Sequence, residues 1–435
     1  MKQSIKQTAD CIYVQARDGT PLMPTFRKGK VKWLLRLGNA IIVCHNPFTI
    51  RLLYDSEKYV QKVSVGVDLG SRYVGISATT ESNELLACQV ELRHDVVKNM
   101  SQRRESRRTR RSRKTRYRKV RFNNRKRKEG WLPPSVAQKA QSVKSVISRI
   151  SKILPVGEVR VEVGKFDVQK LENPDISGTQ YQSGRQLGFQ NVKAYVFCRD
   201  EYKCRKCKGK SGDPVLVVHH IETRLTGGDS PGNMVTLCKT CHDSLHRGEI
   251  DLEIDRIKSY RDATHMNIMK NAAFAGIVSL FGEDKVKMTY GYITKYIRMQ
   301  NDITKSHLSD AQCISGNPNA RQLDNFYAIK MVPRHTRSLH VMKPSKGGVR
   351  RSAVAPHWIG KSRLQRYDFV KYRNIQAFIA GSTGGRPVLR NIDWTLATDK
   401  SSVTAKSVKF LYRKKGSFII QKMDKKKLLK PIEYV

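Results

Sequence analysis

The segment VSVGVDLGSRYVGIS, residues 63–77, decides the fold of the chain. Its first half alternates valine with small or acidic residues, so the valines lie on one face of a strand and Asp68 lies on the other. Gly70-Ser71 predicts a turn, Tyr73–Ala78 a second strand and Glu84–Val90 a third. The sequence therefore predicts an antiparallel meander with a carboxylate at the end of its first strand.

A helix and a strand further along extend this sheet. Residues Val136–Leu154 carry apolar side chains at the spacing of an amphipathic helix, which Pro155-Val156-Gly157 ends. Glu158–Val163 follows as a strand that alternates valine with charged residues, among them Glu162. A helix that leads back into a strand indicates a crossover onto the earlier sheet.

The stretch SHLSDAQCISG, residues 306–316, has the composition of a helix start. Ser306 or Ser309 can serve as the N-cap, and Asp310 falls in the first turn.

Asp68, Glu162 and Asp310 form an ordered set of three carboxylates from distant segments. Three converging carboxylates can hold two Mg²⁺ (or Mn²⁺) ions for in-line attack on a phosphate. One aspartate in a strand is more often a turn cap, so this interpretation depends on the set as a whole.

An arginine-rich run occupies residues 103–128 and contains 16 Lys/Arg against one acid, Glu105. Arginine favours helix, but the like charges repel one another, so we expect a helix that settles against phosphates. A solvated tail or localisation signal is the alternative, less favoured because the run lies between two segments predicted to fold. The arginines predicted to bind nucleic acid are Arg103, Arg104, Arg107, Arg108, Arg110, Arg111, Arg113, Arg116, Arg118, Arg121, Arg125 and Arg127.

Two C-x-x-C pairs, Cys204/Cys207 and Cys238/Cys241, follow a Gly/Gln/Ser-rich stretch at 165–190 that reads as a linker. Four thiolates at tetrahedral distance bind Zn²⁺ in a closed structural site. Because four of the nine cysteines fall in these pairs, metal binding in a reducing cytosol is favoured over a disulfide framework.

Histidines cluster around the second pair. His219-His220 lies between the two cysteine pairs, and His242 and His246 follow the last cysteine. The four cysteines already complete a tetrahedral zinc site, which leaves the histidines for catalysis. Phosphodiester hydrolysis needs a base and a divalent ion, and a histidine can be that base.

The composition indicates a polyanionic partner. The 435 residues carry a formal net charge of +46, and a charge this large repels itself unless a polyanion neutralises it. A basic structural protein with a solvated surface is the alternative. No stretch approaches the length of a membrane span, and the first residues lack the apolar core of a secretory signal, so we expect no membrane partner and a cytoplasmic location.

Both terminal regions are predicted to be basic and rich in strands. Residues 1–60 suggest a compact module with one helix near Gly29–Leu37. Residues 334–435 carry 24 Lys/Arg against 5 acids with interleaved aromatics, and Phe410–Ile420 predicts a hairpin across Lys414–Ser417.

The order C-x-x-C, HHI, GG, N, LC-x-x-CH resembles an HNH nuclease of the ββα-metal type. The resemblance implies that His220 is the general base, that His219 and His242 bind metal, and that Asn233 is a ligand or orients the base. His246 is the alternative to His242, and spacing alone does not choose between them.

The set VSVGVDLGSRYVGIS, VRVEVGKF and SHLSDA is similar to the three motifs of a RuvC-type, RNase H-fold nuclease. His307, three residues before Asp310, matches the histidine that accompanies the last aspartate of such enzymes. With Pro21–Pro24 (PLMP) and the arginine-rich run ending RFNNRKR, the whole order resembles the IscB family, the transposon-encoded ancestor of the type II CRISPR effector nuclease.

This resemblance implies a multidomain α/β fold built on an RNase H-like (RuvC) mixed sheet with helices. An arginine-rich bridge helix and an inserted ββα-metal HNH domain split the sequence of this sheet, and the terminal domains are basic and β-rich. The expected parts are a PLMP N-terminal domain (1–60), RuvC-like part I (61–92), the bridge helix (93–130), RuvC-like part II with the linker (131–190), the HNH domain (191–250), RuvC-like part III (251–332) and a basic C-terminal domain (333–435) that binds DNA or RNA beside the target.

The function implied is that of an RNA-guided DNA endonuclease. A guide (ω RNA) selects double-stranded DNA by pairing, the HNH centre cuts the guide-paired strand and the RuvC-like centre cuts the displaced strand. A monomeric protein in a prokaryotic, nucleoid-associated ribonucleoprotein is expected. The alternatives are a protein-guided HNH homing endonuclease and an RNA-guided complex that binds DNA without cutting it.

Overall fold

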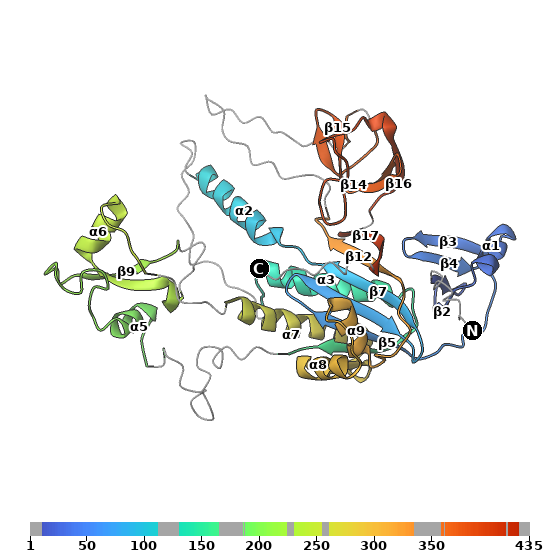
Figure 1. Cartoon of the computed structure of the whole chain (residues 1–435), viewed down its shortest axis with the longest axis horizontal. Coiled ribbons are helices and arrows are strands. Elements are labelled where there is room, and N and C mark those ends of the chain that lie inside the picture. Colours follow the sequence, from blue (N-terminus) through green and yellow to red (C-terminus); the bar gives the residue numbers. More distant parts are fainter. Residues whose placement is uncertain are drawn as a thin grey trace. The chain divides into compact units, whose positions relative to one another are not determined.

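The computed structural model describes residues 11–111, 130–164, 186, 188–223, 230–254, 261–334, 358–360, 362–414 and 416–425 (Figure 1). The chain divides into two compact units, one made of residues 1–164 with 268–435 and the other of residues 165–267. Each unit is described by itself. None of the described helices has both the length and the apolar character that crossing a membrane requires.

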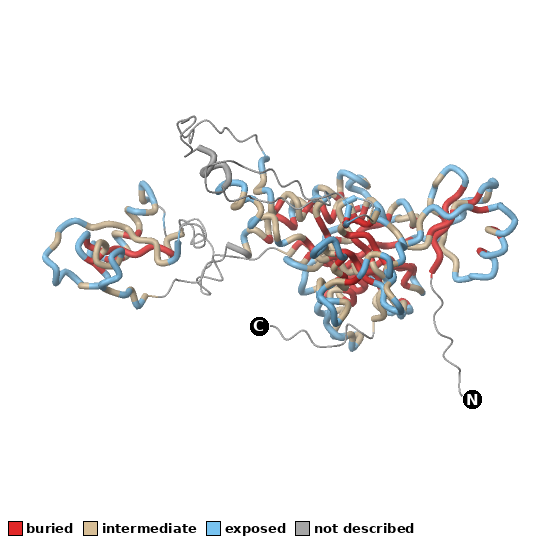
Figure 2. Tube along the Cα trace, turned by 90° about the horizontal axis from the view of Figure 1, so that it is seen from above, coloured by how far each residue is buried: buried red, intermediate tan, exposed pale blue. Residues whose placement is uncertain are grey.

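A seven-stranded mixed sheet of order β11-β8-β5-β6-β7-β12-β17 forms the core of the larger unit. The predicted meander is confirmed, because β5 (Val63–Leu69), β6 (Tyr73–Thr79) and β7 (Glu84–Glu91) pair antiparallel. The predicted crossover is confirmed as well, since β8 (Val156–Glu162) pairs parallel with β5. The side chains of Val63, Val65 and Val67 in β5 and of Val159 and Val161 in β8 are completely buried, and buried residues gather in the middle of the larger unit (Figure 2).

Three further strands complete the sheet. β11 (Val286–Thr289) lies parallel to β8 at one edge. β12 (Asn325–Met331) lies parallel to β7, and β17 (Phe418–Asp424) pairs antiparallel with β12 at the other edge.

Both helices predicted in this unit are present, and further helices lie between them in the sequence. α3 (Pro134–Ile150) buries the predicted apolar stripe but stops at Ile150, four residues before the predicted end, because the chain turns through Ser151–Leu154. α7 (Arg261–Phe281) begins within the last residues of the second unit and continues into this one, and α8 (Gly291–Gln300) comes after it. α9 (His307–Ser315) starts at Ser306, whose side chain accepts a hydrogen bond from the backbone N–H of Ser309, so Ser306 is the cap.

α9 lies directly on the backbones of β5 and β6 (Figure 1). A Cβ at Gly66 would fall 1.9 Å from the Ala311 carbonyl oxygen, and one at Gly75 would fall 1.8 Å from the His307 carbonyl oxygen. Only glycine permits this approach. At the other end of the helix, Ser315 is tied to the sheet by a hydrogen bond with Thr79.

The N-terminal region forms the predicted β-rich module with one helix. Its four-stranded sheet has the order β2-β1-β4-β3, built from β1 (Ile12–Gln15), β2 (Pro21–Thr25), β3 (Ala40–His45) and β4 (Phe48–Leu52). α1 (Lys28–Arg36) is the helix predicted near Gly29–Leu37.

The C-terminal region contains a four-stranded antiparallel sheet, order β15-β14-β13-β16. Its strands are β13 (Phe369–Tyr372), β14 (Ile375–Thr383), β15 (Arg386–Arg390) and β16 (Val408–Tyr412). This agrees with the strand-rich character predicted there.

The hairpin predicted over Phe410–Ile420 is wrong. β16 pairs with β13, whereas β17 leaves for the central sheet and pairs with β12 over seven residues. The connection is held away from a tight turn because Arg413 bonds to Asp368 and Lys414 donates to the carbonyl of Pro333.

α2 (Asp95–Arg111) confirms that the start of the arginine-rich run is helical. The side chains of Arg103 and Arg104 are described; for Arg107, Arg108, Arg110 and Arg111 only the helical backbone is. Three parts of the predictions lie outside the described residues. They are the Gly227-Gly228 pair of the HNH-like motif, the predicted linker apart from a few residues, and the arginines Arg113, Arg116, Arg118, Arg121, Arg125 and Arg127.

The second unit is built around a two-stranded hairpin and a helix. β9 (Leu216–His220) and β10 (Met234–Cys238) pair antiparallel, the short 3₁₀ helix Pro231–Asn233 precedes β10, and α6 (Lys239–Arg247) follows it. α5 (Val192–Arg199) packs against the hairpin, with Asn191 as its cap. The small core contains the cysteines Cys204, Cys238 and Cys241.

Candidate functional site

The three predicted carboxylates come together on the central sheet. Asp68 lies near the end of β5, Glu162 ends β8, and Asp310 is in the first turn of α9. Their oxygens do not all fall within 4.8 Å of one another. The charges of Asp68 and Glu162 nevertheless both act on Asp310, so the three carboxylates lie near one another.

His307 is the nearest partner of Asp68. Its Nδ1 lies 2.6 Å from Asp68 Oδ2, and this hydrogen bond raises the pKa of His307 against the opposing effect of burial. The close approach of α9 at Gly75, which pairs with Asp68 across the sheet, brings the two side chains together.

The other two carboxylates have basic partners that the sequence did not reveal. Lys270 Nζ, on α7, lies 3.5 Å from Glu162 Oε1, and Thr294 donates a 3.1 Å hydrogen bond to Glu162 Oε2. Arg298 Nε, on α8, lies 3.0 Å from Asp310 Oδ1, close enough for an ion pair but not aligned as a hydrogen bond. Each of the three carboxylates therefore has one basic neighbour, and these neighbours come from three different helices: His307 from α9, Lys270 from α7 and Arg298 from α8.

Like charges and burial dominate the electrostatics of this centre. Burial raises the pKa of Asp310 to about 6, with the charges of Asp68 and Glu162 adding to the rise and Arg298 and His307 opposing it. Carboxylates that hinder one another's ionisation in this way favour a divalent cation between them.

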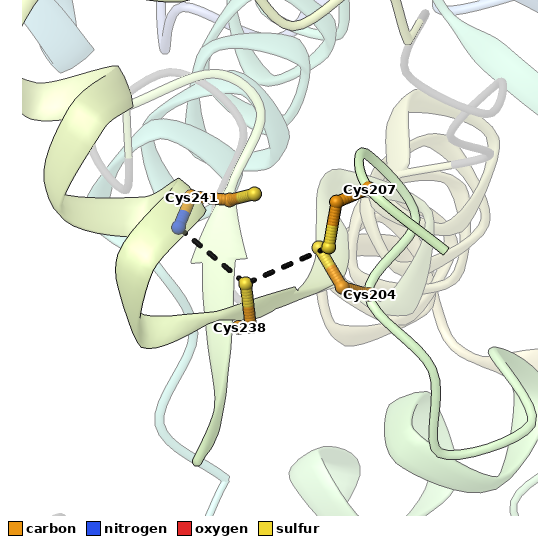
Figure 3. A group of neighbouring side chains, drawn as sticks. All are labelled: Cys204, Cys207, Cys238 and Cys241. Atoms are coloured by element: carbon orange, nitrogen blue, oxygen red, sulfur yellow. Dashed lines mark hydrogen bonds between the residues drawn. The ribbon is translucent and has the colours of Figure 1, made fainter. Parts of the chain in front are cut away.

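The four cysteines of the second unit converge as predicted (Figure 3). Their sulfurs all lie within 4.8 Å of one another, and Cys207 Sγ lies 3.8 Å from Cys238 Sγ. A tetrahedron with Zn–S bonds of about 2.3 Å has edges of roughly 3.8 Å, so the spacing fits Zn²⁺. A hydrogen bond with Ser211 lowers the pKa of Cys207 to about 6, which favours the thiolate that a metal needs.

The cysteine cluster also positions α6. Cys238 caps this helix by accepting a hydrogen bond from the N–H of Cys241, and His242 follows at once. Cys204 and Cys207 come from the segment before β9, so a shared ion would join that segment to the junction of β10 and α6.

Three histidines form a second cluster of possible metal ligands: His219, His242 and His246. The Nε2 atoms of His242 and His246 lie 3.2 Å apart, one helical turn from each other on α6. The His219 ring centroid is 5.3 Å from both of theirs. The structure thus brings both candidates, His242 and His246, to His219, where spacing alone offered one or the other.

Burial and the charges of His242 and His246 lower the pKa of His219. A neutral imidazole is the form that binds a metal ion, so the shift favours ligation.

His220 is the last residue of β9 and is not among the three clustered histidines. Asn233 is fully buried, and its side chain bonds to both backbone groups of Glu222, accepting from the N–H at 2.9 Å and donating to the carbonyl at 3.1 Å. These bonds fix the turn that follows His220. Because both polar atoms of the Asn233 amide are used in them, Asn233 is better suited to orienting His220 than to binding a metal ion.

Two family models match the chain. One, described as RRXRR protein, covers residues 12–184, and the other, described as HNH endonuclease, covers residues 204–248. No curated protein matches it.

Among solved structures, the chain is similar to Streptococcus thermophilus Cas9 in complex with the AGAA PAM (12% identity, TM-score 0.30, 57% of this chain and 32% of that chain). The complexes with the GGAA PAM (14%, 0.31, 56% and 32%) and with the AGGA PAM (14%, 0.32, 57% and 32%) are similar as well. The chain spans about a third of the length of these structures.

The HNH match lies on the unit that holds the cysteine and histidine clusters, and HNH nucleases hydrolyse phosphodiester bonds with the help of a metal ion. The RRXRR match followed by the HNH match agrees with the order of motifs on which the resemblance to the IscB family rests, and the HNH endonuclease domain identifies the chain as a nuclease.

Proposed function

We propose that this nuclease is an RNA-guided DNA endonuclease with two metal-dependent centres, each of which cuts one strand of a DNA duplex. The observation that carries the proposal is that one chain builds two separate sites suited to divalent ions: three carboxylates with His307 on the central sheet, and three histidines in the HNH unit.

In the HNH unit, His219, His242 and His246 would hold the divalent ion. Imidazole nitrogens suit a transition-metal ion better than Mg²⁺, which prefers oxygen ligands, so we propose a divalent transition-metal ion here. Mn²⁺, the alternative to Mg²⁺ expected from the sequence, is the ion to test. When bound, the ion would stabilise the negative charge of the scissile phosphate. His220, held by the turn that Asn233 fixes, would take a proton from the attacking water.

In the larger unit, Asp68, Glu162 and Asp310 would hold Mg²⁺, whose preferred ligands are carboxylate oxygens. Such ions would stabilise the attacking and leaving oxygens of the displaced-strand phosphate. His307 would hold Asp68 in place through the 2.6 Å hydrogen bond and could shuttle a proton at its other ring nitrogen. We propose that this sheet is the RuvC-like, RNase H-type domain predicted from the three motifs.

Zn²⁺ at Cys204, Cys207, Cys238 and Cys241 would be structural, because four thiolates fill a tetrahedral ion and leave no open position. The zinc would fix the segment that carries Cys204 and Cys207 to the junction of β10 and α6, and so stabilise the elements that carry the histidines.

Two features support binding of a guide RNA: the large positive charge of the chain and the arginine-rich helix α2. Arginines along α2 and beyond it would grip the phosphates of a guide–target duplex, whose pairing would supply the sequence information. We further propose that the HNH centre cuts the guide-paired strand, the carboxylate centre cuts the displaced strand, and the complex contains one protein copy and acts in a prokaryotic cytoplasm.

The test is cleavage of a plasmid by the purified full chain with its co-purified RNA, in Mg²⁺ or Mn²⁺ and in EDTA, with and without prior RNase treatment. The proposal expects a linear product that needs both the ion and the RNA. Cleavage that survives RNase would identify a protein-guided homing enzyme, and stable binding without any product would identify a non-cleaving complex.

A further inference from the structure

The outer surface of α8 exposes large aromatic and apolar side chains beside the carboxylate centre. Tyr292, Tyr296 and Met299 follow one another at the i, i+4, i+7 spacing of one helix stripe and are 72%, 61% and 63% exposed. Tyr290, which precedes the helix, is 46% exposed. We name these four residues the α8 tyrosine face.

This face is connected to the carboxylates through a few residues. Thr289, at the end of β11, pairs with Glu162 across the sheet, and Tyr290 is the next residue. A Cβ at Gly291 would lie 3.3 Å from Glu162 Oε1, so the start of α8 lies against this carboxylate.

The side of α8 that faces the protein serves the same centre. Thr294 donates to Glu162, and Arg298 lies beside Asp310. One helix therefore contacts two of the three carboxylates on its inner side and presents tyrosines on its outer side, and Tyr290 is its N-cap residue.

The chemistry of the face suits exposed nucleobases. The rings of Tyr290 and Tyr292 are parallel within 9°, with centroids 6.0 Å apart, so a further flat ring can extend the stack. Lys295 is exposed on the same stripe, and α8 contains two basic and no acidic residues, which complements a phosphate backbone. Bases stack on aromatic side chains regardless of sequence, because every base has a π-face.

We infer that the α8 tyrosine face is a stacking surface for single-stranded DNA, which it delivers to the carboxylate centre. This inference rests on the proposed function and adds to it the surface of this chain that holds the displaced strand, which would bind there by its unpaired bases. A duplex is the poorer fit, because its bases are already stacked on one another and offer the tyrosines no free face.

The experiment measures the binding of a fluorescein-labelled 20-nucleotide oligothymidine to the full chain with its co-purified RNA, by fluorescence anisotropy at high salt. High salt weakens the phosphate contacts that so basic a protein makes everywhere and leaves the stacking contribution. The variants are Tyr292→Ala/Tyr296→Ala and, as the conservative pair, Tyr292→Phe/Tyr296→Phe. Tyr59→Ala is the matched control, because Tyr59 is an 85% exposed tyrosine of the N-terminal region.

The alanine pair is expected to weaken binding by between about fivefold and 150-fold for each base that loses its stacking partner. The phenylalanine pair and Tyr59→Ala should bind like the wild type. Photo-crosslinking with 5-iodouracil in the oligonucleotide should label Tyr292 or Tyr296, as located by mass spectrometry.

Three results would overturn the inference: unchanged binding by the alanine pair, an equal loss of affinity for a 20-base-pair duplex, or a loss in the phenylalanine pair as large as in the alanine pair. The first two would leave the face to a protein partner or to a general role in nucleic-acid binding. Failure of the proposed function is distinguishable, because it appears as absence of ion-dependent cleavage by the wild type, whatever the oligothymidine binding shows.

Discussion

The substitution Gly75→Ala tests how α9 assembles the carboxylate centre. Gly75 pairs with Asp68 across β5 and β6, and an added Cβ would lie 1.8 Å from the His307 carbonyl oxygen, where ordinary contact begins near 3.4 Å. The start of α9 must therefore retreat by about 1.6 Å, and overpacking of this kind costs roughly 1–3 kcal/mol or more. Retreat of this size would break the 2.6 Å hydrogen bond between His307 and Asp68.

Because a misplacement of about 1 Å can reduce a reaction rate by about 10²-fold, we expect at least that loss in cutting of the displaced strand. Cutting of the guide-paired strand should be unchanged, since the HNH centre belongs to the other unit. The assay follows both strands of one end-labelled duplex in the same reaction, together with the thermal unfolding midpoint of the protein, which should fall by several degrees.

Gly157→Ala is the matched control. This glycine lies in β8 of the same sheet, and its added Cβ would meet its nearest neighbour at an ordinary 3.5 Å. Wild-type cutting of both strands by Gly75→Ala, or an equal loss in Gly157→Ala, would refute the reasoning that α9 is held in place by this glycine contact.

Three further predictions concern other parts of the chain. Cys204→Ser should release about one equivalent of zinc per protein and abolish cutting by the HNH centre while sparing the other strand; full zinc content by atomic absorption with normal cutting would contradict it. His246→Ala should reduce Mn²⁺ affinity, measured by calorimetry, at least tenfold if all three histidines bind the ion, whereas unchanged affinity would leave His242 as the helix ligand alone. Burial by itself would raise the pKa of Glu158, but hydrogen bonds from Arg160 and Lys62 outweigh this effect and lower the pKa from 4.5 to about 2. The ionised form thus stabilises the fold above pH 4.5, and this contribution is lost as the pH falls toward 2. Glu158→Gln should therefore lower the free energy of unfolding by urea at pH 7, with a difference from wild type that shrinks between pH 5 and pH 2; a constant difference would be the contrary result.

The sequence predicted those parts of the fold whose signals are local. The valine alternation of β5, the cap at Ser306 and the C-x-x-C spacing each depend on a few neighbouring residues, and each is found in the structure. The hairpin over Phe410–Ile420 failed for the same reason: two strands close in sequence were assumed to pair. Each instead pairs with a strand from elsewhere in the chain, which local propensity does not encode.

The candidate sites show the same division. Asp68, Glu162 and Asp310 could be predicted because their motifs occur in order, but their partners Lys270 and Arg298 carry no such signal. A lysine inside the apolar helix α7 is the one hint, since a buried lysine needs a paired charge. The choice between His242 and His246 could not be made from sequence, because residues four apart share one helix face and both reach His219.

The most direct test of the central claim is strand-resolved cleavage by two single variants, Asp68→Ala and His220→Ala, programmed with the co-purified RNA on a duplex labelled differently on each strand. The account predicts complementary nicking: Asp68→Ala cuts only the guide-paired strand, and His220→Ala cuts only the displaced strand. Loss of both cuts in either variant, or retention of both in either one, would contradict the claim that one chain contains two independent metal-dependent centres.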